Sequence, residues 1–448
     1  LQGDEQQVGP ADDLKVITLI DRGAREARAL DGDPEVQAEL FQTLGTIYGG
    51  LGRFEQAEAL LGKSLERRRA LFGAQSPETA EALVALGSMR QEQARWDEAE
   101  KLVREAIAID RKTLPANHPA LARARAALGH VLVERGHYAA ALPILKEAAD
   151  LLQARADQPL ELRFALSDMA NAQFYLGHYD DSQKLNLELL ELDRKTLGEQ
   201  HANVADDLIN LAVIQQEHGN YAESERLNRQ ALVITEHWFG PEHPLTASNL
   251  TNLSRALNHE GKDAEAEQLL KRALVIDEHV YGPKHPSVSS ALNDLGIAAR
   301  NLGHLDEAAS DFRRMLEIER GLHGEAHERV GVALSNLATV AIERKDFVTA
   351  EQQLRDALRI YAQRGFTDHV RSGTARIYLG RALLGQGRHD EALVESRGGY
   401  EIMQRKKSLQ STAVRLAKDD IVTELTALGR AEEASQFRSA AAAAVAHD

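Results

Sequence analysis

Cysteine is absent from the 448-residue sequence, and proline is scarce, with only 11 residues in the whole chain. The absence of cysteine excludes disulfide bonds, thiolate zinc sites and a cysteine nucleophile. Runs of about 20 apolar residues, which a membrane-spanning helix requires, are also missing. Few prolines together with abundant Ala, Leu, Glu and Arg favour an all-α protein.

Positive charge is in short supply as well. The formal net charge is −16, whereas nucleic-acid binding needs concentrated Lys and Arg, so we expect no nucleic-acid partner. The basic runs "ERRRAL" at 66–71 and "QRKKS" at 404–408 are short, and we interpret them as solvated helix faces. We also expect no membrane contact by this segment, and the sequence leaves its oligomeric state open.

The first residues, "LQGDEQQVGP", are polar and do not resemble a secretory signal. Residues 1–11 are predicted to be a linker or disordered. Because the chain begins with Leu rather than Met, we interpret it as a fragment or a processed form. We expect a soluble segment in the cytoplasm, or one outside the cytoplasm if a membrane span precedes it in the full-length protein.

A tight-turn phrase recurs along the chain, for example "GRFEQAE" from 52 and "GHLDEAA" from 303. Successive copies are 42 residues apart, except for one interval of 41. We call the first residue of each copy the turn position. The ten turn positions are Gly52, Ala94, Gly136, Gly177, Gly219, Gly261, Gly303, Lys345, Gly387 and Gly429. Such a fixed period indicates an array of one supersecondary unit.

The residues around each turn position follow one pattern. A small residue lies five positions after it, as at Ala57 and Ser224, and a large apolar residue lies eight positions before it, as at Leu44 and Leu295. Small residues at such positions are typical of helices that cross at close range. Each copy is therefore predicted to form two helices joined by the turn, and their apolar faces are buried only against neighbouring copies.

The phrase "GPEHP" at 240–244 returns almost unchanged as "GPKHP" at 282–286. The histidines could belong to a chemical site, or the phrase could mark a helix boundary. Glycine commonly ends a helix in the left-handed conformation, and proline is favoured at the first position of the next helix. We therefore interpret the phrase as a boundary, with His243 and His285 as polar residues at helix starts.

The pattern Leu-Gly, Tyr, Gly-x-Phe/Tyr, Ala, Leu and Ala resembles the tetratricopeptide repeat, and the 42-residue period with "GxxHP" resembles its kinesin-light-chain variety. The resemblance implies a right-handed α-solenoid, or superhelix, of about ten helix-turn-helix repeats. We expect an N-terminal capping helix at 12–33 and a regular array at 34–397. Two glycines in "RGGY" weaken a helix, so a looser C-terminal repeat and tail are expected at 398–448.

The segment from about 14 to 60 also resembles the region that joins some bacterial eukaryotic-type Ser/Thr protein kinases to C-terminal tetratricopeptide arrays. The chain itself contains no Gly-rich phosphate loop, no "HRD" and no "DFG". Walker and "GxSxG" motifs are absent too. We expect no catalytic residues and no enzyme activity in this chain, with any kinase domain lying upstream in the full-length protein.

The 17 histidines of the chain raise the question of metal binding. His323 and His327 lie on either side of Gly324, so helical ligand geometry is not secured, and the spacing fixes no acidic ligand beside them. Carboxylate pairs such as Asp206–Asp207 are common on solvated helices and do not indicate an acid–base site. We expect no metal site and no cofactor.

By the resemblance, the first helices of successive repeats line a concave groove that binds a protein or peptide. The residues expected to contact this ligand are Asn171, Asn210, Thr251, Asn252, Arg255, Asn293 and Asn336. An amide can pair with an extended backbone of any sequence, and Arg255 could select a carboxylate. Alternatively, the Asn residues only hydrogen-bond between neighbouring helices and fix their stacking.

The sequence thus leads to two function hypotheses. The first is a non-catalytic protein- or peptide-binding scaffold, as the interaction or regulatory part of a larger signalling protein. The alternative is a ligand-gated peptide sensor that controls an attached kinase domain.

Overall fold

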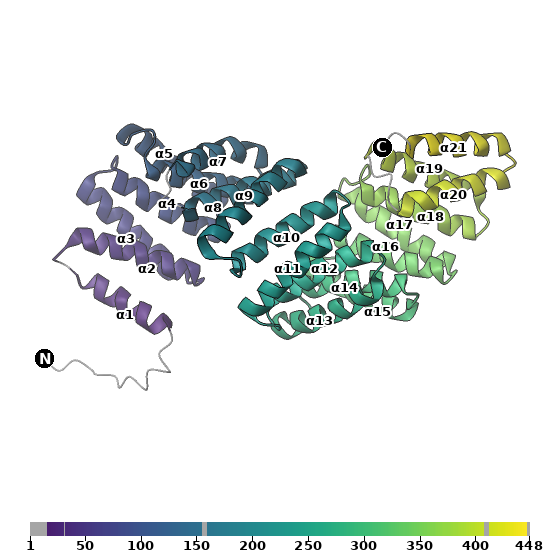
Figure 1. Ribbon diagram of the computed structural model, residues 1–448, viewed down its shortest axis with the longest axis horizontal. Coiled ribbons are helices and arrows are strands. Elements are labelled where there is room, and N and C mark those ends of the chain that lie inside the picture. The colour runs from purple at the N-terminus through teal and green to yellow at the C-terminus, as the bar shows by residue number, and fades with distance from the viewer. Residues whose placement is uncertain (1–15, 31, 155–158, 407–411, 446–448) are drawn as a thin grey trace. The chain divides into compact units, whose positions relative to one another are not determined.

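The computed structural model describes residues 16–30, 32–154, 159–406 and 412–445 (Figure 1). Within these residues the chain forms 21 α-helices and no strand, as the composition predicts. No helix in this part of the chain has both the length and the apolar character needed to cross a membrane. The linker expected at 1–11 lies outside the described residues.

The helices divide into two compact units, unit 1 from Leu1 to His218 and unit 2 from Gly219 to Asp448. The described helices of unit 1 are α1 (Val16–Arg28), α2 (Pro34–Gly50), α3 (Phe54–Phe72), α4 (Pro77–Glu92), α5 (Trp96–Thr113), α6 (Pro119–Glu134), α7 (Tyr138–Gln153), α8 (Pro159–Tyr175), α9 (Tyr179–Leu197) and α10 (Ala202–Glu217). Those of unit 2 are α11 (Tyr221–Phe239), α12 (Pro244–His259), α13 (Asp263–Tyr281), α14 (Pro286–Asn301), α15 (Leu305–His323), α16 (Glu328–Glu343), α17 (Phe347–Gln363), α18 (Val370–Gly385), α19 (His389–Arg405), α20 (Thr412–Ala427) and α21 (Ala431–Val445).

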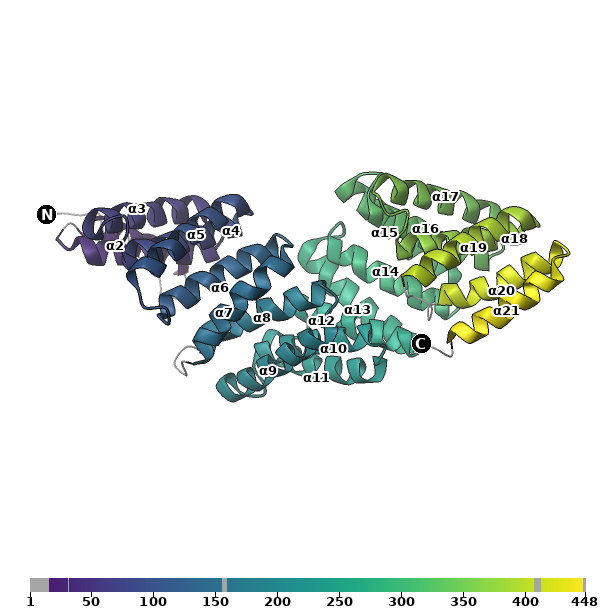
Figure 2. The same cartoon turned by 90° about the horizontal axis from the view of Figure 1, so that it is seen from above.

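From α2 onward, the even-numbered helices are the first helix of each repeat, here called A helices, and the odd-numbered ones are B helices. Within each unit, consecutive helices run antiparallel and side by side (Figures 1 and 2). Successive A helices such as α12, α14 and α16 also contact one another. The A helices of unit 2, from α12 to α20, therefore form a continuous surface.

All ten turn positions have a positive φ angle, from 55° at Ala94 to 79° at Gly303. Residues with a Cβ resist this region, which explains why eight of the ten positions are glycine. Ala94 and Lys345 adopt the same conformation without that advantage, with φ angles of 55° and 62°. The turn reverses the chain, so that each B helix packs back on its A helix.

Histidine caps six of the described A helices at the B-to-A connections, whereas Asp33 caps α2 and Ser76 caps α4. Nδ1 of His243 accepts a hydrogen bond from the backbone N–H of Leu245 at 3.2 Å, and His285 caps α14 in the same way. The same contact recurs at His118, His201, His327 and His369. Pro244 begins α12 directly after its cap. The interpretation of the phrase as a helix boundary is confirmed.

Five of the described B helices end at a glycine, which has the positive φ that was predicted but not a helical ψ. Gly240 has φ 93° and ψ 163°, and Gly282 and Gly324 have similar angles. The prediction of a left-handed helical conformation is wrong, because this is extended backbone with positive φ, a region that essentially only glycine adopts. The extended ψ carries the chain away from the B helix toward the next A helix.

Close packing between helices explains why the repeat has small residues at fixed positions. The small residue five positions after each turn is at most 5% exposed. Gly296 of α14 lies so near Phe312 of α15 that an added Cβ would stand 2.6 Å from the ring. Such close-packed interiors do not accept added atoms, so the relative position of the two helices is fixed.

Helix α1 packs on the first repeat. Ile20 and Ala24 belong to the same apolar cluster as Phe41 of α2. The Tyr48 hydroxyl of α2 donates a hydrogen bond to Asp21 at 2.5 Å. Helix α1 therefore occupies an apolar face of α2 within the range that we assign to a capping helix.

Helix α19 runs unbroken through both glycines of "RGGY" to Arg405. An added Cβ on Gly399 would stand 2.6 Å from the Gly373 carbonyl oxygen of α18. These glycines therefore allow the two helices to approach closely. A lower stability of residues 398–448 stays a prediction.

Candidate functional site

A groove lies on the A-helix surface of unit 2, between α12 and α14, and encloses about 500 Å³. Arg329, the second residue of α16, borders it. Its polar lining includes Ser248, Thr251, Asn252, Arg255, Ser290 and Arg329. We call this hollow the α12–α14 groove, and it brings together three of the predicted ligand-binding residues.

A chain of hydrogen bonds, which we call the polar ladder, crosses three A helices beside this groove. Arg255 of α12 donates to Asp294 of α14 at 2.7 Å and to Asn252 at 3.2 Å. Asn293 donates to Asp294 at 2.8 Å, and Asn336 of α16 donates to Asn293 at 2.8 Å. Four predicted residues are thereby joined through Asp294, whose side chain is buried.

The polar ladder leaves part of these groups open to a ligand. The Arg255 side chain is 40% exposed although it is ion-paired. Asn336 donates one hydrogen bond in the polar ladder, and an amide offers two N–H donors and one acceptor oxygen. Thr251 differs, because it is buried and its hydroxyl donates to the Ala247 carbonyl of its own helix. The helix-stacking contact is therefore present, and ligand contact stays a proposal.

The ion pair of the polar ladder recurs elsewhere in the array. Arg381 pairs with Asp420 at 3.1 Å, and His130 pairs with Asp168 at 3.0 Å. In each case the basic residue lies six positions before one turn, and the carboxylate lies nine positions before the next turn. The hydrogen bond to Asp168 raises the pKa of His130. These repeat positions are thus neighbours across successive A helices.

Asn171 of α8 and Asn210 of α10 have exposed side chains on A helices of unit 1. They lie outside the α12–α14 groove, which belongs to unit 2. A hollow of about 400 Å³ in unit 1 lies over α2, α4 and α6 instead, and residues such as Thr46 and Ser88 line it. The structure therefore brings together only the unit 2 members of the predicted set.

Sequence reasoning predicted only Thr251, Asn252 and Arg255 of the groove, and its charged residues Arg329 and Asp277 are among those that it missed. Arg329 is 38% exposed and donates from Nε to Glu319 at 2.5 Å. Asp277 of α13 also lines the groove, and burial raises its pKa to about 6. The sequence contained a signal that could have identified Asp277, because an acidic residue that is buried in the structure recurs eight positions before several of the cap histidines. These residues are Asp110, Asp193, Asp277 and Glu319.

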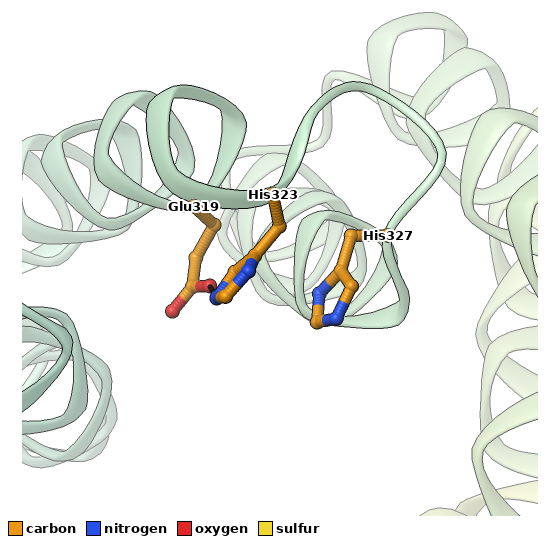
Figure 3. Close-up of side chains that lie close together, drawn as sticks. All are labelled: Glu319, His323 and His327. Atoms are coloured by element: carbon orange, nitrogen blue, oxygen red, sulfur yellow. Dashed lines mark ion pairs between the residues drawn. The ribbon is translucent and has the colours of Figure 1, made fainter. Parts of the chain in front are cut away.

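A second polar cluster lies at the connection between α15 and α16 (Figure 3). Glu319 and His323 come from the end of α15, and His327 is the N-cap of α16. The two imidazole rings are stacked with centroids 4.2 Å apart, and His323 Nε2 lies 3.6 Å from Glu319 Oε2. The structure thus places a carboxylate beside the histidine pair, contrary to the sequence-based argument.

A buried carboxylate pair lies in unit 1 next to Arg163 of α8. Arg163 donates to Asp193 of α9 at 2.5 Å and lies 3.8 Å from Asp207 of α10. Asp207 is only 1% exposed, so its interpretation as a solvated residue is wrong. Burial, and then the charge of Asp193, raise the pKa of Asp207 far above its usual range.

A sequence model of the tetratricopeptide repeat matches the chain at residues 37–112, 86–154, 161–237, 219–279, 255–321, 290–363 and 329–404. The chain belongs to the tetratricopeptide repeat family. No curated protein is significantly similar to it in sequence.

Several solved structures are similar to this tetratricopeptide repeat protein. The apo form of RapI has a TM-score of 0.65 at 15% identity, over 87% of this chain and 98% of RapI. Rap protein complexed with competence and sporulation factor has a TM-score of 0.55 at 14% identity, over 82% of this chain and 97% of its own. A kinesin-light-chain-type protein of Podosopora anserina with nearly identical TPR-like repeats has a TM-score of 0.41 at 21% identity, over 46% of this chain and 97% of its own. The family match and the first two structures confirm the all-α solenoid fold.

Proposed function

We propose that this protein binds a segment of another protein, or a peptide, in the α12–α14 groove. The observation that carries the proposal is the convergence of two part-exposed guanidinium groups, Arg255 and Arg329, with the amide of Asn252 and the hydroxyls of Ser248 and Ser290. An extended segment carries unpaired backbone N–H and C=O groups. Side chains that both donate and accept hydrogen bonds can satisfy those groups.

The two guanidinium groups of the groove favour a ligand with an acidic side chain or a C-terminal carboxylate. Arg255 and Arg329 are each held by a carboxylate of the protein, Asp294 and Glu319 respectively. Because both guanidinium groups are already fixed in place, binding a ligand carboxylate orders little additional side chain. Arginine also matches the planar geometry of a carboxylate with two parallel hydrogen bonds.

Structural likeness supports a binding role. Rap protein, which has a similar fold, was solved in complex with competence and sporulation factor. At 14% identity this is an analogy of fold and carries no residue assignments. We propose a non-catalytic scaffold on this basis. The alternative hypothesis, that the protein controls an attached kinase domain, rests only on the resemblance of the segment from about 14 to 60 to the corresponding region of some bacterial Ser/Thr kinases.

Selection of random short peptides displayed on phage against the purified protein tests the proposal. We expect the enriched peptides to share an acidic residue or a free C-terminus. The Asn252→Ala/Arg255→Ala variant should bind synthetic copies of these peptides about ten-fold more weakly or worse, because charge-assisted hydrogen bonds are lost.

The matched control is Arg314→Ala. Arg314 of α15 is 41% exposed and ion-paired with Glu278, like Arg255 in exposure and pairing, but it does not line the groove. Circular dichroism must first show both variants to be as helical as the wild type. Equal peptide binding by the wild type and the Asn252→Ala/Arg255→Ala variant would refute the groove as the binding site.

A further inference from the structure

We propose that Glu319, His323 and His327 bind one transition-metal ion of the Zn²⁺ class at the connection between α15 and α16 (Figure 3). One ligand atom of each side chain lies within 4.8 Å of the others. Two imidazoles and one carboxylate form a known zinc ligand set, with a fourth position left for water. The sequence-based expectation of no metal site rested on the lack of a fixed carboxylate, which Glu319 supplies.

Glu319 is the strongest indication of a ligand. Its side chain is fully buried, and in the described part of the chain no hydrogen-bond donor reaches its Oε2 atom. Its other oxygen, Oε1, accepts hydrogen bonds from Arg329 Nε at 2.5 Å and from the Ser289 hydroxyl. A buried carboxylate oxygen without a donor is unfavourable. A metal ion at Oε2 would satisfy it, while the contacts at Oε1 hold the carboxylate in orientation.

The spacing between Glu319 and His323 fits a shared ion. His323 Nε2 lies 3.6 Å from Glu319 Oε2, which is too far for a hydrogen bond. Metal–ligand bonds of about 2.1 Å in a tetrahedral site place two ligand atoms about 3.4 Å apart. A small rotation of the imidazole is enough to bring both atoms onto one ion.

To bind a metal ion, His327 has to give up the hydrogen bond by which it caps α16. Its Nδ1 atom accepts the backbone N–H of Arg329 at 3.3 Å, so the neutral ring carries its proton on Nε2. Metal binding at Nε2 shifts that proton to Nδ1 and gives up the cap hydrogen bond, with no net change in protons. The side chain also leaves its stack on His323 to do so.

Ring stacking on His327 would by itself explain the position of the His323 side chain, without a metal ion. In the preceding repeat, Tyr281 stacks on the cap residue His285 with centroids 4.2 Å apart, the same separation as between His323 and His327. This repeat supplies a matched variant, because His323→Tyr keeps the stack and removes the imidazole ligand. His327→Asn likewise keeps a residue type that is favoured at helix N-caps.

A second cluster provides a control within the same protein. Glu267, His304 and Glu307 also bring their ligand atoms within 4.8 Å of one another. The His304 side chain is 49% exposed, and such exposed groups are common without a metal. His304→Ala removes this cluster and leaves the proposed site intact.

Zinc titration of tag-free protein, read out by competition with a chromophoric chelator, tests the proposal. We expect the wild type and His304→Ala to bind one equivalent with the same affinity, and His323→Tyr and His327→Asn to bind at least about ten-fold more weakly. Loading with Co²⁺ should give the visible absorption of a four-coordinate site in the wild type and not in His323→Tyr.

Two results would overturn the proposal. The first is the absence of saturable zinc uptake by the wild type, and the second is equal affinity in the wild type and His323→Tyr. Circular dichroism checks that each variant is folded. If His323→Tyr unfolds, the same comparison between the wild type and His327→Asn decides.

Discussion

At the scale of single residues, the turn positions show how strongly the backbone conformation selects the side chain. Ala94 and Lys345 have φ angles of 55° and 62°, where a residue with a Cβ is strained by about 1–2 kcal/mol. Replacing them by glycine removes this strain and adds about 0.5–1 kcal/mol of backbone entropy to the unfolded chain. Ala94→Gly and Lys345→Gly should therefore each raise the free energy of unfolding by about 0.5–1 kcal/mol.

Urea unfolding followed by circular dichroism measures this change. The reverse substitution, Gly303→Ala, serves as the control, because Gly303 has a φ of 79° at the same repeat position. It should lower the stability by a similar amount. A loss of stability in both glycine variants would show that the turn is not strained.

The buried pair Asp193 and Asp207 leads to a prediction about pH. Because the pKa of Asp207 is raised in the folded protein, the folded state keeps a proton that the unfolded chain has already lost above its usual pKa. The stability contributed by this proton is present at acidic pH and is lost as the pH rises through the raised pKa. Asp207→Asn removes this dependence, so its stability relative to the wild type should grow with pH, by up to about 1.4 kcal/mol per pH unit.

Urea unfolding at about pH 5 and about pH 8 compares the two proteins across this window. Asp181→Asn is the matched control, because Asp181 lies on α9 like Asp193 but is exposed. Its stability relative to the wild type should change little between the two pH values. A constant difference between Asp207→Asn and the wild type would mean that Asp207 is ionised in the folded protein.

At the scale of helices, the boundaries could be predicted from the sequence because local chemistry encodes each of them. A turn with positive φ selects glycine, and a helix start selects a side-chain acceptor such as the cap histidine, so both signals recur with the 42-residue period. The ends of the helices therefore follow from residues within a few positions of them.

Contacts between helices of successive repeats were harder to predict. Arg255 and Asp294 are 39 residues apart, which differs from the repeat period by about one helical turn. Arg255 was predicted to contact a ligand, but its pairing with Asp294 appears only when two A helices are placed next to each other. The cluster of Glu319 and His327 was missed for a similar reason, because the extended backbone at Gly324 sets the direction of the next helix.

At the scale of the whole molecule, the stability of each helix depends on its neighbours, because repeats contact only adjacent repeats. Helix α17 packs between α16 and α18, whereas α21 packs on α20 at the end of the array. Helix α19 contains two glycines, but Gly399 lies directly against Gly373 of α18. We therefore expect loosening to be confined to the last helices, not to begin at residue 398.

Hydrogen–deuterium exchange measured by mass spectrometry tests this expectation. Amides of α21 should exchange fastest, and those of α19 should be protected as well as those of α17, because exchange reports local opening. Gly399→Ala provides the control, since an added Cβ would stand 2.6 Å from the Gly373 carbonyl oxygen and should separate α19 from α18. In this variant, the amides of α18 and α19 should exchange faster than in the wild type, and those of α13 should exchange at the same rate. If α19 of the wild type already exchanges as fast as α21, the glycine pair weakens the helix more than the close packing stabilises it, and the array loosens from residue 398 onward.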